Sequence, residues 1–204
     1  TDGKFSKALV FDGVNDYVNV SNEPNFDFER TNPFSIEAWV KRRTIGALEE
    51  AIVDKKGLFP GYTFRTGYLG DLTLLNFLQF ELGNSGGSVI TVRTSSAAVA
   101  DTDWHYVAVT YTGSSAASGV SIYVDGIARG TTTVDDTLTT STLNNDNLVI
   151  GSRKGNNDRY FNGTIDELSL WNISLDSNTI LQHAQRGWTN LTIYYSASND
   201  STAW

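Results

Sequence analysis

The sequence predicts an all-β protein, built as an antiparallel two-sheet β-sandwich with one short C-terminal helix. Short segments of alternating apolar and polar residues recur along the chain, and Gly, Asn and Asp separate them. Only one late segment has helical spacing. No internal repeat of about 20 to 50 residues is visible, which disfavours a propeller or a solenoid. Many strands with a single helix are typical of two sheets packed face to face.

Length and composition limit the architecture and the possible partners. The 204 residues fit a single domain spanning residues 1–204, and 40% hydrophobic residues are enough for one core. The net charge of -8 argues against a nucleic acid partner but is compatible with calcium and neutral glycans. No run of about 18 apolar residues exists, so we expect no membrane insertion. The absence of Cys excludes disulfides, zinc–thiolate sites and cysteine nucleophiles.

The N-terminal part predicts strands joined by a tight turn. Residues 9–20 form a strand, a turn and a second strand, because Gly13 and Asn15 tolerate the left-handed backbone that a turn needs. Residues 34–41 alternate as expected of a half-buried antiparallel strand. Its inward residues are Phe34, Ile36, Ala38 and Val40.

The middle of the chain, residues 44–87, is less regular and rich in aromatic residues. Short strands near Pro60 and Gly67 carry four of them, namely Phe59, Tyr62, Phe64 and Tyr68. Residues 72–82 predict a long apolar strand whose core residues are Leu78, Phe80 and Leu82.

The second half predicts further strands and the helix. Strands at 104–111 and 120–124 precede Asp125-Gly126, a dipeptide that favours a two-residue hairpin turn, so residues 127–129 should return antiparallel. Another strand covers 148–151. Residues 175–186 form the helix, with Asp176 or Ser177 as its cap, and residues 191–195 close the sheet.

A strand at residues 161–172 places a carboxylate where a core residue should be. Simple alternation puts Asp166 on the inward face with Leu168 and Leu170. An ionised carboxylate there costs several kcal/mol unless it is paired, hydrogen-bonded or bound to a metal. A β-bulge at Ile165 that rotates Asp166 outward is the alternative.

Six segments together resemble the laminin-G-like, concanavalin A-like jelly-roll family over roughly residues 5–195. They are FDGVNDYV at 11–18, FSIEAWV at 34–40, WHYVAVTY at 104–111, IYVDG at 122–126, IG at 150–151 and GTIDEL at 163–168. The resemblance implies a jelly-roll sandwich, often with one calcium ion, in secreted or cell-surface proteins that bind glycans or other proteins.

The resemblance also implies a calcium site. The matching positions are Asp12, Asn15, Asp16 and Asp166, with nearby backbone carbonyls as further ligands. Calcium takes six to eight oxygen ligands, and an Asp/Asn-rich turn beside a strand-borne Asp supplies several of them. The alternative is that Asp16 caps its own turn and that backbone amides satisfy Asp166.

Two groups of residues are candidates for contact with a glycan. Sugar sites commonly combine an aromatic platform with planar hydrogen-bonding groups. The aromatic candidates are Phe59, Tyr62, Phe64 and Tyr68, with Tyr62 and Tyr68 preferred, although aromatic residues in strands are mostly core residues. The polar candidates, which precede the strand of Asp166, are Asn156, Asn157, Asp158 and Arg159, against the alternative of a solvated loop.

We therefore expect a non-catalytic carbohydrate-binding module of a secreted or cell-surface protein, with glycan or glycoprotein partners. The chain carries no signal peptide, which is typical of a mature fragment or of an excised module of a larger multidomain protein. A protein-interaction or spacer domain of an adhesin is the alternative.

A glycoside hydrolase comes third. Some hydrolases of this fold carry Glu-x-Asp-x-x-Glu, whereas Thr164 and Ser169 stand here at the two Glu positions. His105 and His183 lack partners at metal-ligand or triad spacing and are expected to be structural.

Overall fold

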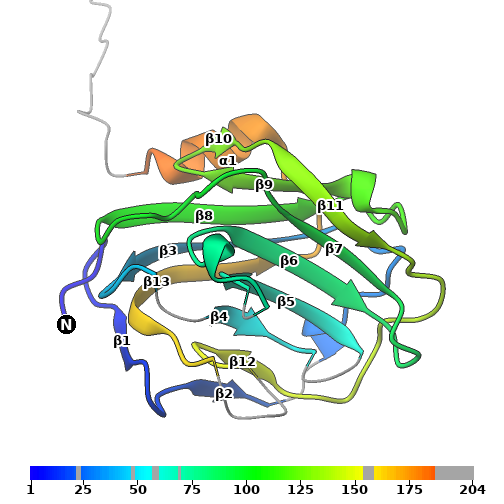
Figure 1. The fold of residues 1–204 in the computed structure, drawn as a ribbon, viewed down its shortest axis with the longest axis horizontal. Helices are drawn as coiled ribbons and strands as arrows, with labels where there is room; N and C mark the ends of the chain where they lie inside the picture. Colours follow the sequence, from blue (N-terminus) through cyan, green and yellow to red (C-terminus); the bar gives the residue numbers. More distant parts are fainter. Residues whose placement is uncertain (22–23, 47–48, 57–59, 69, 154–158, 187–204) are drawn as a thin grey trace, which may run out of the picture.

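The computed structural model describes residues 1–21, 24–46, 49–56, 60–68, 70–153 and 159–186. These residues form two antiparallel sheets packed face to face, which confirms the predicted sandwich (Figure 1). In spatial order the six-stranded sheet contains β1 (Leu9–Asp12), β13 (Asn162–Trp171), β3 (Phe34–Arg42), β8 (Trp104–Tyr111), β9 (Val120–Val124) and β10 (Ile127–Ala128). The seven-stranded sheet contains β11 (Thr131–Asp136), β7 (Val89–Thr94), β6 (Leu78–Gly83), β5 (Gly61–Thr66), β4 (Glu50–Asp54), β12 (Leu148–Ile150) and β2 (Val18–Val20).

Short helical elements join or cover the strands. The 3₁₀ turns are η1 (Pro24–Phe26), η2 (Leu72–Leu74) and η3 (Ala117–Gly119), and the α-helix is α1 (Ser177–Ala184). Asp176 caps α1, because its carboxylate accepts from the backbone amides of Asn178 and Thr179, both at 2.9 Å. No helix among the residues placed in the structure is long and apolar enough to cross a membrane.

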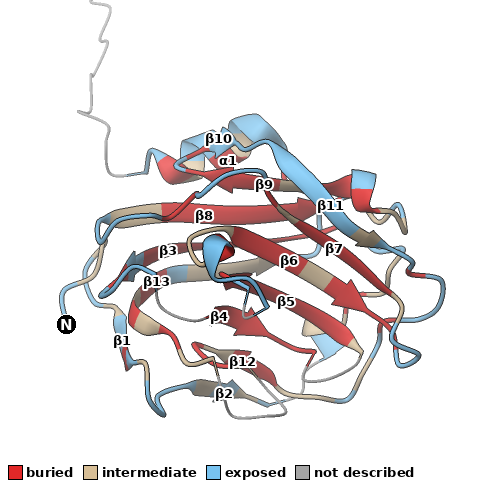
Figure 2. Cartoon of the chain, in the orientation of Figure 1, coloured by how far each residue is buried: buried red, intermediate tan, exposed pale blue. Residues whose placement is uncertain are grey.

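The main core lies between the two sheets. In the central strands alternate residues point into the space between the sheets, and the buried interior coloured red in Figure 2 includes them. The predicted inward residues of β3 and β6 all belong to this core, at 1% exposure or less: Phe34, Ile36, Ala38, Val40, Leu78, Phe80 and Leu82. The region predicted as one long strand over 72–82 is instead η2 followed by β6.

Helix α1 covers the outer face of the six-stranded sheet. A second apolar cluster forms there, in which Ile180 and Ala184 of the helix pack with Trp39 and Tyr106. In Figure 1 the helix lies beside β10, at the edge of the molecule. Both faces of the six-stranded sheet are therefore partly occupied by packing, whereas no helix covers the outer face of the seven-stranded sheet in the described ranges.

Two turns illustrate how local sequence sets the topology. Asp125 (φ 55°) and Gly126 (φ 81°) adopt the left-handed conformations of the expected two-residue turn, and β10 returns antiparallel to β9. By contrast, the turn at residues 13–17 carries the chain from the six-stranded to the seven-stranded sheet, since β1 pairs with β13 and β2 pairs with β12. The predicted strand at 191–195 lies outside the described residues.

Candidate functional site

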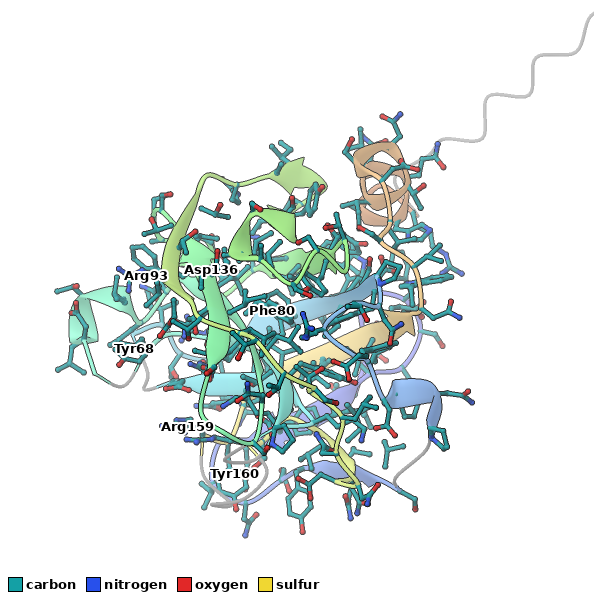
Figure 3. The ribbon with its side chains drawn as sticks, turned by 90° about the vertical axis from the view of Figure 1, so that its right-hand side faces the viewer. Tyr68, Phe80, Arg93, Asp136, Arg159 and Tyr160 are labelled. Atoms are coloured by element: carbon teal, nitrogen blue, oxygen red, sulfur yellow. The ribbon has the colours of Figure 1, made fainter. Side chains whose placement is uncertain are left out.

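The outer face of the seven-stranded sheet carries two rows of polar side chains. The core row of Phe64, Phe80 and Val92 alternates with outward residues on the same three strands. Strand register aligns Arg65, Gln79 and Arg93 in one outward row and Thr63, Glu81 and Thr91 in the next. In Figure 3, Phe80 lies in the interior while Tyr68, Arg93 and Arg159 lie on one side of the molecule.

This face is hollowed. One cavity of about 120 Å³ and a neighbouring one of about 220 Å³ share Arg65, Tyr68 and Glu81 in their linings. We call the two together the outer groove, which the following residues also line: Glu49, Asp54, Lys56, Thr63, Gln79, Thr91, Arg93, Val134, Asp135, Arg153 and Arg159. Strands β4 to β7 and β11 and the β5–β6 connection thus contribute to one continuous surface.

A network of ion pairs fixes one half of the groove. The carboxylate of Glu49 lies 2.8 Å from Arg65 Nε and 3.1 Å from Arg159 Nε. Glu81 lies 2.8 Å from Lys56 Nζ and 2.9 Å from Arg65 Nη2. Burial raises the pKa of Glu81, but Arg65 and Lys56 outweigh it and hold this pKa below its usual range. These groups therefore hold one another in place.

The other half of the groove presents polar groups without such partners. Gln79 is 3% exposed and Thr91 is 6% exposed, yet neither side chain makes a hydrogen bond to any residue that the structure describes. The amide of Gln79 and the hydroxyl of Thr91 are not among the fully buried polar atoms that lack a hydrogen bond, so both groups open into the groove. Tyr68, at 42% exposure, lies beside them as an accessible aromatic surface. A polar ligand, or water in its absence, would satisfy these groups.

The predicted glycan residues fall in different places. Tyr68 and Arg159 line the outer groove, whereas Asn156, Asn157 and Asp158 lie outside the described residues. Tyr62 and Phe64 correct the prediction, since both lie in the main core at 1% exposure or less, and the hydroxyl of Tyr62 donates to Phe26 O at 3.0 Å. Phe59 lies outside the described residues. Gln79, Thr91 and Arg93 were missed, although their alternation with core residues would have placed them on the outer face.

The Asp/Asn-rich turn satisfies its own backbone. Asp12 accepts from the amides of Val14 at 2.8 Å and Asn15 at 3.1 Å, and these bonds lower the pKa of the Asp12 carboxyl. The carboxylate of Asp16 accepts from the amide of Asp12 at 3.0 Å. This is the Asx-turn arrangement that the sequence left open as the alternative to calcium.

Asp166 lies apart from that turn. Asp12 pairs with Asn162, which lies four residues before Asp166 in β13. At roughly 3.3 Å per residue, Asn162 and Asp166 are about 13 Å apart along the strand. The carboxylate of Asp166 accepts from Phe5 N at 3.0 Å and from Glu167 N at 2.9 Å. Asp166 is thus separated along β13 from the turn that holds Asp12, Asn15 and Asp16, and among the described residues no group of three or more His, Cys, Asp or Glu could hold a metal. The calcium site stays a prediction.

A β-bulge explains the position of Asp166. The register of β13 against β3 shifts between Asp166 and Ser169, and Glu167 has a φ of 50°. Ile165 and Leu168 consequently both face the main core, while Asp166 is buried beneath the N-terminal segment on the outer face. The inward prediction for Asp166 is therefore wrong, and the alternative holds with the bulge after Asp166 rather than at Ile165.

A separate hollow of about 130 Å³ lies between the six-stranded sheet and α1. Glu37 accepts there from the hydroxyl of Tyr106 and contacts His183 Nδ1 at 3.0 Å, and Trp171 stacks on the His183 ring. These contacts tie the helix to the sheet, in agreement with the structural role expected of His183. His105 likewise contacts Asp101 and Asp125, both at 2.9 Å.

Comparison with solved structures shows the same fold in proteins of low identity. The binding domain of Paraclostridial Mosquitocidal Protein 1 matches with a TM-score of 0.70 and 14% identity over 92% of this chain and 45% of that chain. A protein from Bacteroides ovatus ATCC 8483 with a proposed carbohydrate-binding role gives 0.64 and 22%, over 86% and 46%. Domain 4 of AbnA, a GH43 extracellular arabinanase from Geobacillus stearothermophilus, in complex with arabinotriose, gives 0.63 and 19%, over 91% and 80%.

The chain spans less than half of the first two of these structures. No curated protein sequence matches it significantly. The family model of the concanavalin A-like lectin/glucanases superfamily matches residues 12–181, which include every strand except most of β1, and most of α1. The match covers most of the chain, and this chain therefore belongs to the concanavalin A-like lectin/glucanases superfamily.

Proposed function

We propose that the chain is a non-catalytic carbohydrate-binding module that holds its ligand in the outer groove. The observation that carries this proposal is the accessible ring of Tyr68 beside the unpartnered side chains of Gln79 and Thr91. An aromatic surface packs against the apolar face of a sugar ring, while amide and hydroxyl groups bind its hydroxyls. The structure of AbnA Domain 4 with arabinotriose supports the proposal at the level of the fold.

A binding role fits the groove better than hydrolysis. A glycosidase needs one carboxylic acid with a raised pKa to protonate the leaving group. Glu81 has a lowered pKa, and Glu49 is held between Arg65 and Arg159. These carboxylates order the groove instead of supplying a proton to a substrate.

The parent protein is proposed to be secreted or displayed at the cell surface. Soluble glycans and glycoproteins are available to a module there, and the acidic net charge of -8 argues against nucleic acid as the partner. The short span of this chain relative to two of its structural neighbours supports a module within a larger protein.

A glycan-array screen with matched variants tests the proposal. Tyr68→Ala should weaken binding about tenfold or more, because it removes the aromatic contact. Tyr17→Ala removes an equally accessible ring outside the groove, at 47% exposure, and should leave binding unchanged. Tyr62→Phe should also leave glycan binding unchanged, since Tyr62 is buried in the core.

Each array is run with calcium and with a chelator. Glycan binding that depends on Tyr68 both with calcium and with chelator would support the outer groove as the binding site. Binding that is lost with chelator and is indifferent to Tyr68→Ala would place the site elsewhere. Absence of binding to every glycan would favour the protein-interaction or spacer role.

A further inference from the structure

The cations of the outer groove differ in whether they have carboxylate partners. Lys56, Arg65 and Arg159 each lie within 3.1 Å of Glu49 or Glu81. The side chain of Arg93 forms no ion pair and no hydrogen bond with any residue in the described ranges. Its guanidinium is therefore a partly exposed, permanently charged group with open donors in the cavity of about 220 Å³.

Two acids in the surroundings of Arg93 accept hydrogen bonds from other residues. The carboxylate of Asp71 accepts from Thr73 N at 2.9 Å and from Thr73 Oγ1 at 2.7 Å. Arg93 contributes to the lowered pKa of Asp71 after these two bonds, so it acts on that carboxylate at a distance without pairing with it. Asp135, which lines the same cavity, accepts from Thr137 Oγ1 at 2.9 Å.

Neighbouring groups define what a ligand at Arg93 must offer. Gln79 lies directly opposite Arg93 across β6 and β7, and Tyr68 and Thr91 line the same cavity of about 220 Å³. A planar guanidinium binds a carboxylate through two parallel N–H···O bonds. Within the same cavity, an amide and a hydroxyl can bind the hydroxyl groups of a sugar, and an aromatic ring can pack against the sugar ring.

We propose that the outer groove selects acidic saccharides and that Arg93 binds the carboxylate of a uronic acid residue. This inference rests on the proposed carbohydrate-binding function and names its ligand class. Among the groove residues that the structure describes, the unpaired guanidinium of Arg93 suits one negative charge per bound sugar. Neutral saccharides would bind at the same place through Tyr68, Gln79 and Thr91 but without the charge-assisted bonds to Arg93.

The test compares oligogalacturonides with their carboxyl-reduced counterparts, which differ only in the carboxylate. Isothermal titration calorimetry should give wild-type protein at least about tenfold tighter binding of the acidic form. Arg93→Gln should abolish this preference by lowering the affinity for the acidic form to that for the reduced form, and Arg93→Lys should retain part of the preference. Lys41→Gln removes an exposed cation from β3 in the other sheet and should keep the preference.

The outcomes separate the two proposals. Equal binding of both forms with continued dependence on Tyr68 would overturn the acidic selectivity and leave the carbohydrate-binding function standing. Tighter binding of a sulfated neutral oligosaccharide than of the uronate would also overturn the carboxylate assignment. Loss of the preference in Lys41→Gln as well as Arg93→Gln would show a general charge effect instead of a site. Absence of binding to any saccharide on the array and in this titration would overturn both proposals.

Discussion

Gln79 and Arg93 lie opposite each other on β6 and β7, and neither side chain has a polar partner in the part of the chain that the structure describes. The same strands bury Phe80 and Val92 on the inner face and hold Glu81 in ion pairs on the outer one. The groove thus combines ion-paired side chains, which hold one another in place, with side chains whose donors and acceptors have no protein partner among the described residues. Such a division suits a binding site because ordering the ligand requires little rearrangement of the protein.

Gln79→Met should weaken glycan binding and leave the stability of the free protein nearly unchanged. The substitution keeps the side-chain volume but removes an amide that lines the groove without a protein partner and that water can reach, so the free energy of unfolding should change by less than about 1 kcal/mol. Urea unfolding measures this change, and titration with the glycan found on the array measures the affinity. Gln182→Met, on the exposed face of α1, should change the free energy of unfolding by no more than about 0.5 kcal/mol. A destabilised Gln79→Met protein would show that the amide is already well bonded, and would count against the site.

Asp166→Ala should destabilise the protein to the same extent with calcium and with chelator. Its carboxylate holds the amides of Phe5 and Glu167, so its loss should cost about 1–3 kcal/mol whatever the metal content. Thermal unfolding with added calcium or EDTA checks this. A calcium-dependent midpoint in the wild type that disappears in both Asp166→Ala and Asp12→Ala would show that these carboxylates act on one ion, contrary to their separation along β13.

The case of Asp166 also shows where sequence reasoning reached its limit. Alternation along 34–41 and 78–82 predicted the core correctly because those strands are regular, and residue parity then fixes the face. In β13 a single residue, Glu167, departs from extended geometry and inverts the parity of everything before it. Nothing in the residue types around 165–169 marks that position, since Glu is not a residue that favours a positive φ.

The outer groove was recognisable only in part for a related reason. Tyr68 and Arg159 were candidates on chemical type alone, and both line the groove. The alternation in β6 implied that Gln79 faces outward, but its neighbours Arg65 and Arg93 come from other strands, and only the strand register brings the three together. Contacts between segments that are far apart in the sequence, such as Arg65 with Glu49, decide whether a side chain of the groove has a polar partner. Tyr62 failed as a candidate because its aromatic ring belongs to the inward face of β5.

His105 should make the protein more stable at mildly acidic than at alkaline pH. Its Nδ1 lies 2.9 Å from Asp125 Oδ2 and its Nε2 lies 2.9 Å from Asp101 Oδ1, and only the imidazolium form can donate from both nitrogens. The hydrogen bond to Asp125 raises the pKa of His105, burial opposes it, and Asp101 raises it further. Since the folded pKa lies above the unfolded value of about 6.5, this stabilisation is fully present below that pH and is lost as pH rises through the folded pKa.

Urea unfolding of wild type and His105→Gln at pH 5.5 and 8.5 checks the sign of this effect. The difference in unfolding free energy between the two proteins should be larger at pH 5.5, where the imidazolium binds both carboxylates. An NMR titration should place the pKa of His105 above about 6.5 and show it falling in Asp101→Asn. A substitution at Asp101 is preferred to one at Asp125, because Asp125 also accepts from Tyr106 N at 3.0 Å and forms the turn after β9. A pKa at or below the unfolded value, or a stability difference that grows with pH, would mean that burial outweighs the two carboxylates.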